Sequence, residues 1–221
     1  MQPEFWIQRW QEQQIGFHLE ESNPLLVQHW QALQVEPPAR IFVPLCGKSL
    51  DLVWLRDQGY DVQGVEISTL AVQDFFNEQG IPYQVERQHG MEVWQSDNLC
   101  IWCGDFFELS SSHLGQIDAV YDRAALIAMP ADLRPMYVQH LLAITGQPAQ
   151  FLVTLDYPQS QMAGPPFAVS NNEVLELYQT TYPELVSPHY SQDVLAGHAR
   201  FAERGLTALH ENVYLLQVPK K

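Results

Sequence analysis

The sequence has few positively charged side chains. Its 221 residues include 11 lysines and arginines against 26 aspartates and glutamates, which gives a formal net charge of −15 at pH 7. Proteins that bind DNA or RNA use Lys and Arg to neutralise phosphates, so nucleic acid is a poor partner for this chain. An anionic membrane surface is disfavoured for the same reason. We therefore expect neither nucleic acid nor membrane among its partners.

Long apolar runs are also absent, and cysteine is scarce. No run approaches the roughly 18 residues that a membrane-spanning helix needs, and the first residues do not join a basic region to an apolar stretch as a secretory signal does. The three cysteines give no support for a disulfide framework. Cys100 and Cys103 would point to opposite faces of a strand, so we expect no metal site there. These features predict a cytoplasmic protein.

No internal repeat, low-complexity block or flexible linker divides the sequence. Its composition, with 46% hydrophobic and 17% charged residues, is typical of a globular chain. We expect residues 1–221 to form a single domain. Within it, residues 1–38 are expected to be a helical extension, because Phe5, Trp6 and Trp10 would share one face of a helix.

From residue 40 onward, short apolar runs alternate with helical patterns. Strands are predicted at 41–45, 62–65, 99–103, 117–121 and 151–155. This alternation predicts an α/β protein with a mostly parallel, twisted sheet and helices on both faces. Two further stretches, at 186–190 and 209–218, predict antiparallel pairing at the C-terminal end of the sheet.

Helix starts and stops support this alternation. Ser49 and Ser68 are expected to cap the helices that follow the first two strands. Gly59 and Gly80 are expected to end them.

The turn after the first strand reads Pro44-Leu-Cys-Gly-Lys-Ser49, and in doubly wound folds this turn usually holds the cofactor. A P-loop would need glycine where Phe42 stands, and Pro44 removes an amide that would contact phosphate, so we reject an ATP site. The dinucleotide pattern G-x-G-x-x-G is absent because Gly47 stands alone. A cofactor without a pyrophosphate needs only one close backbone approach of this kind.

Two acidic residues at strand ends extend this interpretation. Glu66 follows Gly47 by 19 residues, the spacing typical of a carboxylate that binds the ribose of an adenosine. Asp105 follows a later strand, where it either reaches the adenine or caps a helix. One glycine with these two acids favours S-adenosylmethionine over a nicotinamide cofactor.

Several segments resemble the thiopurine S-methyltransferase family in its bacterial form. They are Phe5-Trp6, Trp10, Gly16-Phe-His18, Phe42-Val-Pro-Leu-Cys-Gly-Lys48, Gly64-Val-Glu-Ile-Ser68, Asp122-Arg-Ala-Ala-Leu126, Gly164-Pro-Pro-Phe167 and Tyr214-Leu-Leu216. The resemblance covers essentially the whole chain, and it departs from the family at Ala124, where the family has glycine. It implies a Rossmann-like class I methyltransferase fold that uses S-adenosylmethionine, releases S-adenosylhomocysteine and needs no metal.

The resemblance also implies roles for individual residues. The cofactor contacts would be Trp10, Leu45, Gly47, Glu66, Asp105, Phe106 and Arg123. The substrate side would be formed by Phe17, Pro166 and Phe167, and the polar groups near the acceptor sulfur would be Asp122, Arg123 and Arg200. Around Arg200 the sequence matches the family loosely, and Arg204 is a nearby alternative.

Methyl transfer from a sulfonium is an in-line displacement in which the protein mainly orients the acceptor. An arginine suits the acceptor anion because its guanidinium is planar and permanently charged. Asp122 would either take a proton through water or orient Arg123. We favour orientation, because an aspartate beside an arginine is expected to have a lowered pKa and to be a poor base.

The sequence thus predicts a monomeric thiol methyltransferase whose partner is a small aromatic or heteroaromatic thiol, including thiopurines. Methylation of tellurium or selenium compounds for detoxification is one alternative. A non-catalytic protein that binds an adenosine ligand is another.

Overall fold

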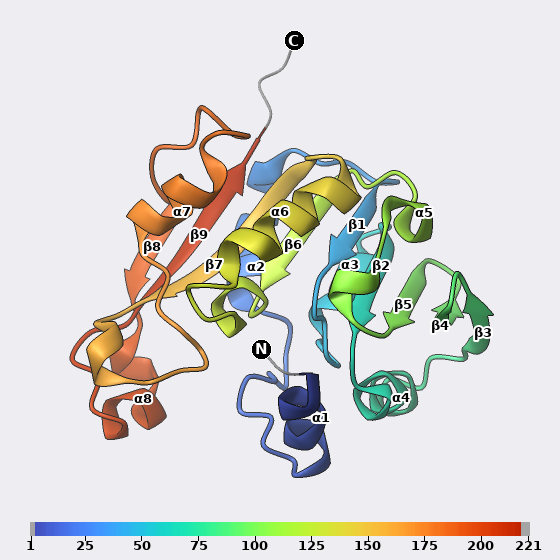
Figure 1. Cartoon of the computed structure of the whole chain (residues 1–221), viewed down its shortest axis with the longest axis horizontal. Helices are drawn as coiled ribbons and strands as arrows, with labels where there is room; N and C mark the ends of the chain where they lie inside the picture. Colours follow the sequence, from blue (N-terminus) through green and yellow to red (C-terminus); the bar gives the residue numbers. More distant parts are fainter. Residues whose placement is uncertain (1–2, 218–221) are drawn as a thin grey trace.

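The computed structural model describes residues 3–217, and a nine-stranded sheet forms its centre (Figure 1). The strand order is β3-β4-β5-β2-β1-β6-β7-β9-β8. The strands are β1 (Arg40–Val43), β2 (Asp61–Glu66), β3 (Gln84–Gln88), β4 (Met91–Ser96), β5 (Leu99–Cys103), β6 (Ala119–Arg123), β7 (Ala149–Asp156), β8 (Tyr190–Asp193) and β9 (His210–Leu216).

The central strands β5, β2, β1, β6 and β7 pair in parallel. Antiparallel strands flank them on both sides, with β3 and β4 at one edge and β9 and β8 at the other. The predicted α/β class and the antiparallel C-terminal end are confirmed. After β1 the chain first builds β2 on one side and later β6 on the other, so the strand order reverses beside β1. Ligands of doubly wound folds bind at such a reversal, beyond the carboxyl ends of the strands.

Two parts of the sheet differ from the prediction. The hairpin of β3 and β4 was not predicted. The strand expected at 186–190 was predicted too early, because β8 begins at Tyr190, while Val186 is 69% exposed. The residues of β8 have no apolar pattern of their own. This polar edge strand forms because it pairs with β9. The predicted end of the last strand, Val218, lies outside the described residues.

The helices cover both faces of the sheet, as predicted. They are α1 (Pro3–Gln11), α2 (Pro24–His29), α3 (Asp51–Asp57), α4 (Thr69–Glu78), α5 (Ser111–Leu114), α6 (Arg134–Thr145), α7 (Asn171–Tyr178) and α8 (Ala199–Glu203). Short 3-10 helices lie at Trp30–Leu33, Phe106–Glu108, Leu126–Ala128, Gln159–Gln161 and Leu195–Gly197.

Each face has its own apolar core. One core joins α5, α6 and α7 to the sheet through residues such as Tyr137 and Tyr178. The other joins α2, α3 and α4 to the opposite face through residues such as Trp30 and Phe75. Cys100 packs against the first core and Cys103 against the second, as expected for side chains on opposite faces of β5.

The two predicted serine caps have different outcomes. Ser68 caps α4, because its hydroxyl accepts a hydrogen bond from the amide of Ala71 (3.3 Å). The prediction that Ser49 caps α3 is wrong by one residue. The N-cap is Leu50, and the Ser49 hydroxyl accepts from the amide of Asp51 (3.2 Å).

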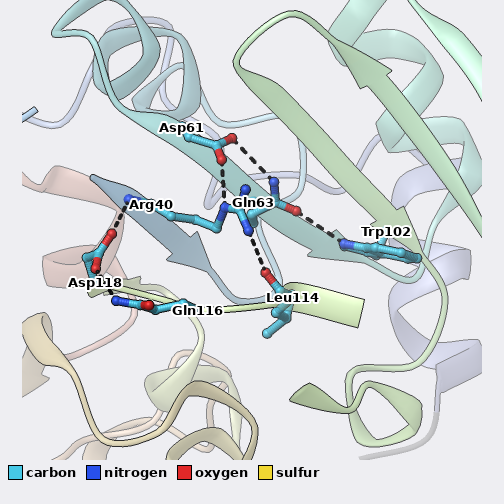
Figure 2. Close-up of polar contacts among 7 residues, drawn as sticks. All are labelled: Arg40, Asp61, Gln63, Trp102, Leu114, Gln116 and Asp118. Atoms are coloured by element: carbon cyan, nitrogen blue, oxygen red, sulfur yellow. Dashed lines mark hydrogen bonds and ion pairs between the residues drawn. The ribbon is translucent and has the colours of Figure 1, made fainter. Parts of the chain in front are cut away.

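A polar network ties the amino ends of β1 and β2 to α5 (Figure 2). Arg40 Nε donates to Asp61 (2.6 Å), and Arg40 Nη1 donates to the carbonyl of Leu114 (3.2 Å). Gln63 accepts from the Trp102 indole (3.3 Å). A polar cavity of about 340 Å³ opens beside this network, and none of the residues predicted for the site lines it. This end of the sheet is therefore held by structural contacts, and the site must be sought at the carboxyl end.

The N-terminal helix lies at that carboxyl end. In Figure 1, α1 sits beyond the ends of the central strands, and its Trp10 is buried at 3% exposure. Within residues 3–217, no helix is both long and apolar enough to cross a membrane.

Candidate active site

The loop after β1 turns sharply against the N-terminal helix. Leu45 and Gly47 both have positive φ angles, +47° and +54°. A Cβ atom at Gly47 would lie 2.9 Å from Cζ2 of Trp10, so only glycine fits both the backbone conformation and the indole ring. The close approach at Gly47 was predicted for a cofactor, and the group packed on this glycine in the structure is Trp10.

Glu66 connects this loop to the end of β2. Its carboxylate accepts hydrogen bonds from the amides of Gly47 (2.9 Å) and Ser68 (2.8 Å). Burial raises the pKa of Glu66 to about 7, although these amides, the amide of Ile67 and the Trp10 indole partly offset this rise. A buried carboxylate held by backbone amides is a rigid acceptor, and a pair of vicinal hydroxyls is a ligand of matching chemistry.

Asp105 and Phe106 follow the neighbouring strand β5. The amide of Gly104 donates to the carbonyl of Glu66 (2.9 Å), which brings Asp105 close to the loop of Glu66. The Asp105 carboxylate accepts from the amide of Phe107 (2.9 Å) and caps the 3-10 helix that follows. Of the two roles weighed for Asp105, the structure shows the cap. Phe106 is buried against Tyr137, with ring centroids 5.0 Å apart.

Arg123 and Arg200 meet at the N-terminal segment, although 77 residues separate them. Arg123, at the end of β6, donates through Nη1 to the carbonyl of Phe17 (3.2 Å). Arg200, on α8, donates through Nη1 to the carbonyl of Gly16. Burial, with the nearby charges of Arg123 and Arg204, lowers the pKa of Arg200.

Phe17 links these arginines to the loop of Gly47. Its ring lies edge-to-face against Trp10, with centroids 5.4 Å apart, and against Trp6 at 5.7 Å. Trp10 in turn packs on Gly47. Residues predicted for the cofactor and residues predicted for the acceptor therefore share one region.

The expectation for Asp122 is wrong. Adjacent strand residues point to opposite faces, and the Asp122 carboxylate bonds the Tyr137 hydroxyl (2.7 Å) and the amide of Leu126 (3.1 Å) on the face away from Arg123. It does not orient Arg123. Its pKa is raised to about 6, not lowered, because full burial outweighs these hydrogen bonds. The strand predicted at 117–121 ended before Asp122, whereas β6 continues to Arg123, so the alternation of faces was not applied to these two residues.

Asp122 instead closes a tight loop in which Ala124 has a φ of +68°. This is the position where the related family has glycine. A left-handed conformation costs a non-glycine residue about 1–2 kcal/mol. The chain keeps the loop conformation despite this cost.

Pro166 and Phe167 lie on the segment between β7 and α7. The carbonyl of Pro166 accepts from the Tyr157 hydroxyl (2.6 Å), and the amide of Phe167 donates to the carbonyl of Ile127 (2.7 Å). The Phe167 ring folds over Gly164. Within residues 3–217, ring contacts join Trp10 to Phe17, but none joins either ring to Phe167. Of the residues predicted for the substrate side, Phe17 therefore packs with the N-terminal indoles, while Phe167 lies apart from it.

Sequence reasoning missed Glu211. This acid lies half-buried on β9, and its charge interacts with those of Arg123 and His198. Burial raises its pKa, and the two basic side chains partly oppose the rise. The sequence did contain a signal for Glu211: it is an acidic residue in a largely apolar strand that continues into Tyr214-Leu-Leu216.

Comparisons with known proteins agree with this geometry. The family model described as Thiopurine S-methyltransferase matches residues 1–219. A thiopurine S-methyltransferase of Nitrosospira multiformis is 47% identical over 218 residues, covering 98% of each chain. One from Pseudomonas paraeruginosa is 48% identical over 218 residues, covering 98% of this chain and 99% of its own.

Solved structures show the same fold at low sequence identity. An S-adenosylmethionine-dependent methyltransferase from Anabaena variabilis has a TM-score of 0.65 at 14% identity, over 98% of this chain and 95% of its own. The 1,6-didemethyltoxoflavin N1-methyltransferase of Burkholderia thailandensis, solved with its substrate and S-adenosylhomocysteine, has a TM-score of 0.62 at 14% identity, over 98% and 87%.

Proposed function

Because the chain belongs to the thiopurine S-methyltransferase family, we propose that it transfers a methyl group from S-adenosylmethionine to the sulfur of aromatic and heteroaromatic thiols, including thiopurines. One observation carries this proposal. Trp10 and Phe17 join the loop of Gly47 and Glu66 to the two arginines, Arg123 and Arg200. A nucleoside-type cofactor and an anionic acceptor would therefore meet at the reversal of the strand order.

The cofactor half is built from residues of five segments. We propose that S-adenosylmethionine is held by Trp10, Leu45, Gly47, Glu66, Asp105, Phe106 and Arg123. When bound, it supplies a methyl group on a positively charged sulfur. The fit rests on the buried Glu66 carboxylate, which suits the ribose hydroxyls, and on the indole of Trp10 beside it. With the cofactor bound, the Trp10 ring would contact an apolar part of it, and Arg123 would hold its methionine end.

The acceptor half supplies charge and orientation. Arg123 and Arg200 attract the thiolate, and Phe17, Pro166 and Phe167 form the surrounding walls. Orientation of the acceptor sulfur opposite the departing sulfur contributes about 7–11 kcal/mol to lowering the barrier. This displacement requires no metal. The role of Asp122 is indirect: its hydrogen bonds to Leu126 and Tyr137 fix the conformation of the loop after Arg123.

We further propose that residues 1–221 work as one domain and that residues 1–38 cover the pocket for the cofactor and the acceptor. The contacts of Trp10 and Phe17 support this role. A monomer in the cytoplasm is the proposed state. The free thiols of Cys46, Cys100 and Cys103 are consistent with a reducing compartment.

Calorimetric titration with S-adenosylhomocysteine, with ATP and NADH as controls, tests the cofactor assignment. We expect selective binding of S-adenosylhomocysteine, followed by methylation of a thiopurine in a radiolabelled-methyl assay. Preference for ATP or NADH would contradict the assignment of the site. Binding of S-adenosylhomocysteine without methylation of any aromatic thiol would contradict the proposed reaction.

A further inference from the structure

Asp122 lies on the face of the sheet opposite to Arg123, so it cannot take the proton of a thiol held beside that arginine. A thiol must lose its proton when it becomes a thioether, and some thiols are protonated at neutral pH. The acidic residues that share a face with Arg123 are therefore the relevant candidates.

Strand register places Glu211 on that face. Arg123 pairs with Val153, and Val153 pairs with Val213 on β9. Tyr121 and Val213 belong to the same core, so their side chains lie on the same face of the sheet. Arg123 is two residues from Tyr121, and Glu211 is two residues from Val213, so both side chains lie on that face as well. Glu211 pairs with Leu155, two residues beyond Val153. Its side chain is thus farther toward the carboxyl edge of the sheet than Arg123, where the acceptor would lie.

Two other acids on this side, Asp51 and Glu66, are already engaged. The Asp51 carboxylate accepts from the amide of Asn23 (2.6 Å) and the hydroxyl of Tyr121 (2.8 Å). The two oxygens of Glu66 bond the amides of Gly47 and Ser68. In the described part of the chain, by contrast, no hydrogen bond or ion pair engages the Glu211 carboxylate.

The surroundings of Glu211 suit a proton acceptor. The charged and titratable groups around it are Arg123 and Tyr121 from β6 and His198 from the start of α8, and its neighbour on β8 is the neutral Gln192. Burial raises the pKa of Glu211 above its ordinary value, while the two basic side chains favour its ionised form. A general base is most effective when its pKa lies near the working pH.

From this geometry, and on the basis of the function proposed above, we infer that Glu211 is the catalytic base that takes the proton from acceptor thiols that are not ionised. The S–H bond breaks and its proton passes to a Glu211 carboxylate oxygen. The electron pair of the acceptor sulfur forms the bond to the methyl carbon. The bond from that carbon to the sulfonium sulfur breaks, and its electron pair stays on the departing sulfur. Glu211 later releases the proton to water.

Thiols of graded acidity test this inference with Glu211→Gln, which removes the base but keeps the shape of the side chain. For benzyl mercaptan, which is protonated at neutral pH, kcat/KM is expected to fall about 100-fold or more, as for other lost general bases. For a nitro-substituted thiophenol, which is already ionised, it is expected to change less than about threefold. The rate of the wild type with benzyl mercaptan should decline as the pH falls and Glu211 becomes protonated, and this dependence should be absent in the variant.

Two controls separate this role from others. Glu203→Gln changes an exposed acid on α8 and should leave both rates unaltered. Titration with S-adenosylhomocysteine and thermal unfolding should be the same for Glu211→Gln and the wild type. An equal loss of rate for both thiols would contradict a base and indicate that Glu211 positions Arg123. A wild type that methylates neither thiol would instead contradict the proposed function itself.

Discussion

At the scale of single residues, conformation and burial define the unusual positions of this site. Glu66 and Asp122 are fully buried acids with raised pKa values, and Ala124 has a left-handed backbone. Each stands at the carboxyl end of a central strand or just beyond it. Their effects can be separated by substitutions that change one property at a time.

Ala124→Gly is expected to stabilise the protein. Glycine relieves a left-handed strain of about 1–2 kcal/mol, but it adds about 0.4–1 kcal/mol of unfolded-state entropy. The net gain in the free energy of unfolding should be about 0.5–1 kcal/mol, measured by urea denaturation. Ala125→Gly is the matched control, because Ala125 is buried with a φ of −85° and its replacement should destabilise. A destabilised Ala124→Gly variant would contradict the strain.

Glu66→Ala is expected to weaken cofactor binding by about 1.5–3 kcal/mol, because it removes hydrogen bonds to a charged group. Calorimetry with S-adenosylhomocysteine measures this change, and circular dichroism checks that the variant still folds. Unchanged affinity in a folded variant would remove Glu66 from the site.

At the scale of elements, the alternation of strands and helices could be predicted because the central strands are buried on both faces and read as apolar runs. The hairpin of β3 and β4 could not, because every residue of β3 is exposed or half-buried. The positions of Gly47 after β1 and of Glu66 at the end of β2 could also be predicted, because both lie where strands end. The face of Asp122 was not predicted because the predicted strand ended at Tyr121, before reaching it. The face of Glu211 relative to Arg123 could not be predicted because it depends on the register between strands far apart in the sequence.

The contact between α1 and the first loop predicts an unequal pair of glycine substitutions. Gly47→Ala strains the backbone and also forces its Cβ to 2.9 Å from Trp10, whereas Gly80→Ala, at φ +61°, meets no atom within 4 Å. Gly47→Ala should therefore lower the thermal unfolding midpoint more than Gly80→Ala and should also weaken binding of S-adenosylhomocysteine. Equal effects on stability would show that Trp10 moves away at no cost.

At the scale of the whole molecule, the net charge of −15 and the buried acids make stability depend on pH in an unusual direction. Glu66 and Asp122 have folded-state pKa values of about 7 and about 6, above their ordinary values of 4.5 and 3.8. Between these limits the folded state binds protons that the unfolded state has lost, so stability falls as the pH rises. Repulsion among the surface carboxylates acts in the same direction.

We therefore expect the free energy of unfolding to be higher at pH 5 than at pH 8. Asp122→Asn retains an oxygen for the Leu126 amide and an NH₂ group for the Tyr137 oxygen, but it does not titrate. Its slope of stability against pH, measured by urea denaturation between these pH values, should be shallower than that of the wild type. Identical slopes would show that Asp122 is not buried as described.

The hydrogen bonds from Arg123 to Phe17 and from Arg200 to Gly16 have a consequence for kinetics. Each guanidinium donates a hydrogen bond to a carbonyl oxygen of the chain itself. The carbonyls of residues 16 and 17 therefore compete with an incoming thiolate for the arginine donors. An acceptor that uses these Nη1 donors must exchange with the carbonyls, although each guanidinium has further donors to offer. We therefore expect a thiol that Glu211 has deprotonated to displace these carbonyls more readily than the same thiol before it has lost its proton, because an anion is a stronger hydrogen-bond acceptor for arginine than a neutral sulfur.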